Sequence, residues 1–179
     1  FDPFILSKKL TVEKLLEKVE RVGDGLYPFT EKLVVSFADI AHYKRVQRNL
    51  ISGGFPDYIE FDQPKMEAVA TGLQEINRKW GLQIATCAEA IDLSPYAITH
   101  NKCIDDQLLS ELFPQDQALM NFLGYETAQP SLFPGTTETG RRTINLKDKG
   151  QRKACGCIVS KDIGQYRTCR YLCQYCYAI

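Results

Sequence analysis

The order of apolar runs and amphipathic helices constrains the fold more than any other feature of the chain. Three apolar runs, residues 1–6, 32–39 and 82–87, alternate with two helical patterns, residues 11–22 and 64–80. The second run is nearly continuous, as is typical of a strand covered on both faces. This order predicts parallel strands joined by right-handed helical crossovers, and therefore an α/β fold.

Capping residues set the predicted ends of both helices. Thr11 is suited to cap the first helix, and Gly23 and Gly25 are expected to close it. Pro64 fits the first turn of the second helix, and Gly81 marks its end.

The remaining segments carry weaker signals. Residues 40–62 are predicted to form a long connection broken at Gly53-Gly54-Phe-Pro56, and residues 88–102 a loop. Short helices are expected over 105–113 and 116–123.

Three parallel strands with open edges would make a poor domain by themselves. They fit better as the C-terminal part of a (β/α) barrel, a partial barrel of the TIM-like kind. Phe1 begins inside a predicted strand without a preceding Met, so we expect the earlier strands before it. The predicted organisation is a βαβαβ barrel portion with following short helices (1–123), an irregular surface excursion (124–150) and a cysteine-rich tail (151–179).

Composition narrows the class of protein. The 179 residues are 44% hydrophobic and 25% charged, ordinary values for one globular domain. The net charge of zero gives no general electrostatic reason to bind nucleic acid or an anionic membrane. No apolar run has the length of a membrane span, and no signal peptide opens the chain. Seven cysteines, five of them between 155 and 176, suit metal ligation in a reducing cytosol better than a disulfide framework.

The tail cysteines Cys169, Cys173 and Cys176 have the spacing C-x3-C-x2-C. Such a loop can curl around a [4Fe–4S] cluster, and three ligands leave one iron open to a small molecule. Cys173-x2-Cys176 is equally the spacing of a zinc knuckle, which Cys155-Gly-Cys157 could complete to four thiolates. Uncommitted thiols are the third interpretation, and spacing alone leaves all three open.

Blocks along nearly the whole chain carry a wider resemblance. The blocks are Phe1–Leu6, Val34–Asp39, Thr86–Leu93, His100–Asp106, Ala154–Cys157, Ser160–Tyr166 and the closing cysteine loop. With these blocks the chain resembles a bacterial family known only as a domain of unknown function. The cysteine-rich C-terminus of that family is similar to the iron–sulfur loop near the N-terminus of radical S-adenosylmethionine enzymes. Tyr175 stands where such loops keep an aromatic residue.

The resemblance implies a chemistry. The open iron of a cluster held by Cys169, Cys173 and Cys176 would take the amino and carboxylate groups of S-adenosylmethionine, with Tyr175 near the adenine. Reduction by an electron donor would cleave the cofactor, and the 5′-deoxyadenosyl radical would remove a hydrogen atom from a small-molecule or other unknown substrate. Radical S-adenosylmethionine cores are partial six-stranded barrels, so three strands would make about half of one. Their loop usually follows the first strand, whereas here it closes the chain.

Other candidate residues follow the predicted strands. Asp39, Cys87 and Glu89 come at strand ends, where α/β barrels place their active sites, so Asp39 and Glu89 are candidate catalytic acids. Equally, Asp39 could cap a helix, Cys87 fill the core and Glu89 be a solvated loop acid. The two histidines, His42 and His100, have no partner pattern and receive no catalytic role.

A second set of cysteines comprises Cys87, Cys103, Cys155 and Cys157. Four thiolates suffice for a closed site, either zinc or an auxiliary [4Fe–4S] cluster. Alternatively, Cys87 is a buried apolar residue and Cys103 a bystander. Two functions therefore remain: a radical S-adenosylmethionine-like enzyme, or a non-enzymatic metal-binding module with a structural zinc or closed cluster.

Overall fold

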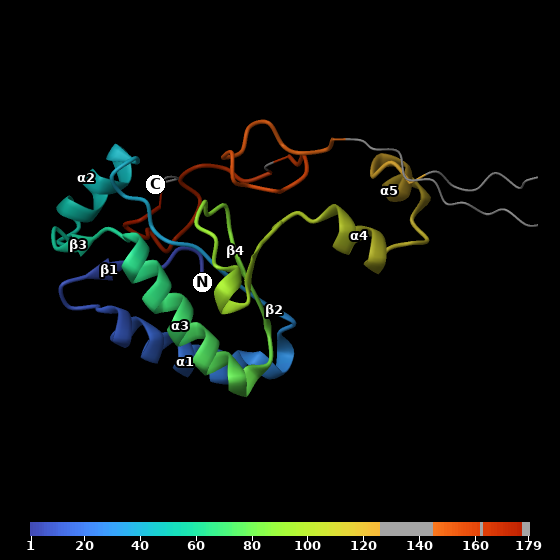
Figure 1. Cartoon of the computed structure of the whole chain (residues 1–179). Coiled ribbons are helices and arrows are strands. Elements are labelled where there is room, and N and C mark those ends of the chain that lie inside the picture. Colours follow the sequence, from blue (N-terminus) through green and yellow to red (C-terminus); the bar gives the residue numbers. More distant parts are fainter. Residues whose placement is uncertain (126–144, 162, 177–179) are drawn as a thin grey trace, which may run out of the picture. The chain divides into compact units, whose positions relative to one another are not determined.

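The computed structural model describes residues 1–125, 145–161 and 163–176, and it is a mixed α/β structure (Figure 1). Its helices and strands follow one another in the order β1 (Leu6–Ser7), α1 (Val12–Leu26), η1 (Tyr27–Phe29), β2 (Lys32–Val35), α2 (Lys44–Ser52), β3 (Tyr58–Ile59), α3 (Gln63–Trp80), β4 (Gln83–Thr86), η2 (Ser94–Tyr96), β5 (Ile98–His100), α4 (Asp106–Leu112) and α5 (Gln117–Phe122).

The chain divides into two compact units. The first comprises Phe1–Asn101 and Asp162–Ile179, and the second comprises Lys102–Lys161. The predicted tail, 151–179, therefore contributes to both units, and most of the predicted excursion, 126–144, lies outside the described residues. No helix in the described ranges is both long and apolar enough to cross a membrane.

The sheet of the first unit has the order β2-β4-β5, and both pairings are parallel. Lys32–Val35 pairs with Gln83–Thr86 residue for residue, which confirms the predicted parallel relation between these two runs. β5 lies inside the segment predicted to be a loop. Only Ile98 of its three residues is buried, so its sequence has no apolar run to indicate a strand. The described strands do not close into a barrel.

The first apolar run lies beside β2. The Phe4 N–H donates to the Ser36 carbonyl at 2.7 Å, the Ala38 N–H donates to the Phe4 carbonyl at 2.9 Å, and Phe4 and Phe37 form a parallel bridge. The run then turns away, because β1 pairs antiparallel with β3. Its start extends the parallel arrangement, whereas its end belongs to a small separate ladder that the sequence did not predict.

Both long helices pack on one face of the sheet. Leu15 and Val19 of α1 join Val69 and Leu73 of α3 in one buried cluster with Val35 of β2. Figure 1 shows the two helices running alongside each other. As predicted, α3 carries its proline in the first turn and ends at Gly81 in the left-handed conformation, with φ of 67°.

The predicted end of α1 was wrong, because the helix continues through Gly23 and Gly25 to Leu26. Trp80 accounts for the glycine at position 23, since a Cβ atom there would overlap the Trp80 ring. The Trp80 Nε1–H donates to Asp24 at 2.9 Å, and its ring stacks on Tyr27 with centroids 6.5 Å apart. Gly23 therefore serves the close approach of a ring and does not end the helix.

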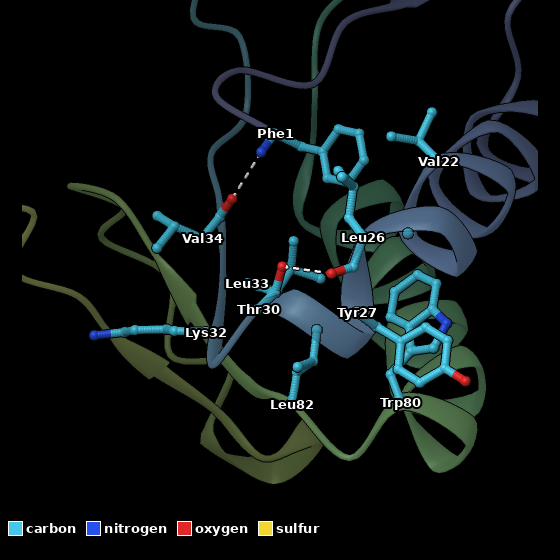
Figure 2. A pocket seen from close by; sticks show the side chains of 11 residues that line it. Phe1, Val22, Leu26, Tyr27, Thr30, Lys32, Leu33, Val34, Trp80 and Leu82 are labelled. Carbon is cyan, nitrogen blue, oxygen red and sulfur yellow. Dashed lines mark hydrogen bonds between the residues drawn. The ribbon is translucent and has the colours of Figure 1, made fainter.

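Figure 2 shows this contact at the wall of a pocket of about 310 Å³. Tyr27 and Trp80 form one side, and Phe1 and Leu82 contribute apolar side chains from neighbouring segments. The pocket borders the amino end of β2, where the Phe1 amino group donates to the Val34 carbonyl at 3.0 Å.

The long connection 40–62 was predicted without regular structure, and this was wrong. It contains α2 and β3, and α2 buries only Val46 and Leu50. Two apolar residues one turn apart in a polar segment give little helical periodicity, so the sequence signal is weak. Gly53 caps α2 and is thus the breaker that the sequence indicated.

The second unit contains the two predicted short helices. Asp105 caps α4 by accepting from the Gln107 and Leu108 N–H groups, and Asp116 caps α5 by accepting from the Leu119 N–H. Beyond the undescribed 126–144, an antiparallel bridge joins Lys147 to Ile158.

Replacement of Gly23 by Ala tests the helix contact. We expect the Gly23→Ala variant to lose about 1–2 kcal/mol of unfolding free energy, because overlap with Trp80 outweighs the gain in helix propensity. Gly25→Ala is the matched control, since a Cβ there meets nothing within 4 Å and should stabilise by up to about 1 kcal/mol. Urea unfolding of both variants measures the difference, and equal stabilisation by both would contradict the packing account.

Candidate site at the carboxyl edge of the sheet

The strand ends place the predicted acids at one edge of the sheet. The Cys87 N–H donates to the Val35 carbonyl at 2.8 Å, so the chain beyond β4 stays beside the chain beyond β2. Glu89 strengthens this link, because its Oε1 accepts from the Phe37 N–H at 2.8 Å. Asp39, Cys87 and Glu89 thus follow the carboxyl ends of parallel strands, where α/β proteins bind ligands.

Asp39 has a partner that sequence reasoning missed. His42 Nδ1 lies 2.7 Å from Asp39 Oδ1, three residues away and largely exposed. The hydrogen bond and charge of Asp39 raise the pKa of His42, and Glu60 adds a smaller effect in the same direction. The sequence signal for this pair was an Asp three residues before a His. That spacing brings the two side chains together only when the intervening loop turns back on itself.

Glu60, at the end of β3, is a further carboxylate that the sequence did not indicate. Its Oε2 accepts from the Ile40 N–H at 3.4 Å, and its Oε1 is buried without a hydrogen-bond partner. The charge of Glu60 acts on His42 in the same direction as that of Asp39, so the two carboxylates together favour the protonated ring.

The tail cysteines lie on a compact loop. The Cys176 N–H donates to the Cys173 carbonyl at 2.8 Å, which closes a tight turn, and Leu172 just before it has a φ of 48°. Cys169 and Cys173 are exposed and Cys176 is half-buried. The turn brings the backbone of Cys173 and Cys176 together, and the exposed thiols are accessible.

This loop packs against the connection that follows β2. Tyr175 contacts the buried cluster of Ala38, Ile40, Val46 and Leu50, and Asn49 of α2 donates to the Cys176 carbonyl at 3.4 Å. In Figure 1 the described part of the tail, drawn in red, runs close to α2, in agreement with this hydrogen bond. The loop is therefore held near the carboxyl end of β2, the same edge that carries Asp39.

An apolar pocket of about 410 Å³ adjoins the loop. Cys173 and Tyr175 line it on the tail side, and Leu50, Phe55 and Tyr58 line it from α2 and β3. The Tyr58 hydroxyl accepts from Gln47 at 2.7 Å, which fixes the ring that faces the pocket. The pocket gives the cysteine loop an apolar wall.

The second predicted cysteine set is divided between the two units. Cys87 belongs to the first unit, while Cys103, Cys155 and Cys157 belong to the second. The Cys103 N–H donates to Cys157 Sγ at 3.2 Å. Across residues 1–125, 145–161 and 163–176, no three His, Cys, Asp or Glu side chains are placed so that they could hold a metal ion as they stand.

Comparison with known proteins gives a family. The model of the Domain of unknown function (DUF1848) matches residues 1–178. The chain belongs to this family. No curated protein and no solved structure matches it. The predicted family is thereby confirmed, and the description of DUF1848 assigns no activity to the site.

The Asp39–His42 pair predicts a pH dependence. Replacing Asp39 by Asn should lower the pKa of His42, because both larger favourable effects come from Asp39. Glu60→Gln should lower it less. The His42 pKa is raised in the folded state, so the stability from this pair is fully present below the unfolded value of about 6.5 and is lost as pH rises through the folded pKa.

Titration of the His42 ring resonances by nuclear magnetic resonance measures both variants. An unchanged His42 pKa in Asp39→Asn, or a larger change in Glu60→Gln, would contradict the arrangement.

Proposed function

We propose that this chain is a radical S-adenosylmethionine-like iron–sulfur protein whose C-terminal loop, through Cys169, Cys173 and Cys176, holds a [4Fe–4S] cluster with one open iron. The observation that carries the proposal is the packing of this loop through Tyr175 against the segment that follows β2. A loop of the required spacing thus stands at the carboxyl edge of a parallel sheet, where barrel enzymes place their active sites.

The thiols suit the group they would hold. Thiolates are the ligands of iron–sulfur clusters, and the turn from Cys173 to Cys176 gives two of them a short common backbone. Cys169 and Cys173 are exposed, so rotation of their side chains toward Cys176 meets little packing resistance. For Cys173 and Cys176, whose backbones already meet in the turn, the proposed convergence requires side-chain rotation, and Cys169 would join them from four residues before Cys173.

The strand arrangement supports a barrel-like fold. The segment 1–4, β2, β4 and β5 lie next to one another in chain order and run parallel. Both α1 and α3 cover the face that carries Val35. Doubly wound sheets reverse their strand order and carry helices on both faces, whereas a barrel keeps chain order with helices outside. We therefore propose that the first unit is part of a partial TIM-like barrel.

When bound, the cluster and S-adenosylmethionine would supply reductive cleavage of the cofactor to a 5′-deoxyadenosyl radical, with the electron coming from a separate donor. The residues of the chain would hold these groups at the tail loop and shape the edge of the sheet beside it. Tyr175 packs against a buried apolar cluster, and the apolar pocket beside Cys173 could receive an apolar part of a ligand. Glu89 positions the end of β2 through Phe37, and Asp39 holds a proton on His42 at the same edge.

Anaerobic reconstitution of the full chain with iron and sulfide tests the proposal. We expect a brown protein whose reduced electron paramagnetic resonance signal shifts on addition of S-adenosylmethionine, with formation of 5′-deoxyadenosine. Replacement of Cys169, Cys173 or Cys176 by Ala should abolish both the resonance signal of the tail cluster and the formation of 5′-deoxyadenosine, because each replacement removes one of three ligands.

Variants at Cys155 and Cys157, changed to Ala singly and together, are the controls. They should keep the tail signal and its response to S-adenosylmethionine. Loss of tail metal in either single variant, without any response to the cofactor, would instead establish the closed metal-binding module. A colourless protein whose zinc content falls when Cys169, Cys173 or Cys176 is replaced would do the same.

A further inference from the structure

The cysteines of the second unit meet at one place. The Ile158 N–H donates to the Ile104 carbonyl at 3.1 Å, and the Asp148 N–H donates to the Cys157 carbonyl at 3.0 Å. The Cys155-Gly-Cys157 segment is therefore held between the segment of Cys103 and that of Asp148. Backbone pairing on two sides fixes this segment, so the proximity of the thiols is built into the fold.

The sulfur of Cys157 has the surroundings of a thiolate. The backbone N–H groups of Cys103, at 3.2 Å, and of Ile104 both donate to it, and the side chains of Cys155 and Cys103 contact it as well. Cys155 and Cys157 are only 7% and 8% exposed. Hydrogen bonds from backbone N–H groups to a buried sulfur stabilise its charged form.

The backbone holds the sulfur of Cys157 in place. Its Sγ accepts from the Cys103 N–H, whereas a cysteine that merely filled an apolar core would have no such donor.

We propose that Cys103, Cys155 and Cys157 bind a zinc ion in the second unit, at a site separate from the tail loop. Three thiolates leave one position of a tetrahedral ion for water or an added ligand. Cys157 already contacts both other cysteines, so binding requires rotation of the exposed Cys103 and adjustment of Cys155. Cys87, which the sequence grouped with these three, belongs to the first unit, so the proposed ligand set comprises only the three cysteines of the second unit.

A full-length chain with Cys169, Cys173 and Cys176 all replaced by Ser isolates this site from the tail. In that background we expect the reduced, metal-stripped protein to bind a single equivalent of Zn²⁺, measured by competition with a chromophoric chelator. Titration with Co²⁺ should give thiolate-to-metal charge-transfer absorption and the visible bands of tetrahedral coordination. Since the tail ligands are absent, the outcome is independent of the proposed radical chemistry.

Single replacements in the same background identify the ligands. Cys103→Ser, Cys155→Ser and Cys157→Ser should each weaken Zn²⁺ binding by about a hundredfold or more, while Cys87→Ser should leave it unchanged. Circular dichroism checks that each variant is folded, and the exposed Cys103 is the replacement least prone to unfold the chain. A folded Cys103→Ser variant with undiminished affinity, a Cys87→Ser variant that loses binding, or a background protein without thiolate–cobalt absorption would overturn the proposal.

Discussion

The parallel pairing of β2 with β4 is the interaction on which the first unit depends. Its register aligns Val35 with Thr86, so the segments that leave the two strands emerge side by side. The Cys87 N–H and the Glu89 carboxylate then continue the attachment beyond the strands, to Val35 and Phe37. Every candidate group of this unit, from Asp39 to the tail loop, lies at or near the edge that this register creates.

The connection after β2, residues 40–62, supplies apolar and charged side chains at that edge of the sheet. Ile40, Val46 and Leu50 form a small buried cluster separate from the main core, and Tyr175 of the tail packs against it. Without an ordered segment 40–62, the surface on which Tyr175 packs would lack Ile40, Val46 and Leu50. The same segment supplies His42 and Glu60, so its folding accounts both for the attachment of the tail and for the charge beside it.

The sequence predicted the features that rest on repeated local signals. The apolar faces of α1 and α3, the start of α3 at its proline and the parallel relation of β2 and β4 all follow from periodicity and from the alternation of elements. What it missed depends on tertiary contacts. The sequence predicted that Gly23 ends α1, whereas in the structure Gly23 lies within the helix and makes room for the ring of Trp80.

The features of the candidate site likewise fall into those that the sequence could predict and those that depend on tertiary contacts. The strand-end acids were predictable from chain order alone, as were the cysteine spacings. The Asp39–His42 pair, the buried oxygen of Glu60 and the N–H groups around Cys157 depend on how loops fold, which spacing does not encode. Separation of Cys87 from Cys103, Cys155 and Cys157 into different units likewise has no sequence signature.

The central claim is that the tail loop leaves one iron open at the carboxyl edge of the sheet. Electron–nuclear double resonance of the reduced, reconstituted chain tests it directly, with S-adenosylmethionine carrying nitrogen-15 in its amino group. We expect a nitrogen-15 coupling to the cluster in the 179-residue chain, because the amino group would bind the open iron. An intact reduced cluster that shows no such coupling at saturating S-adenosylmethionine would contradict it.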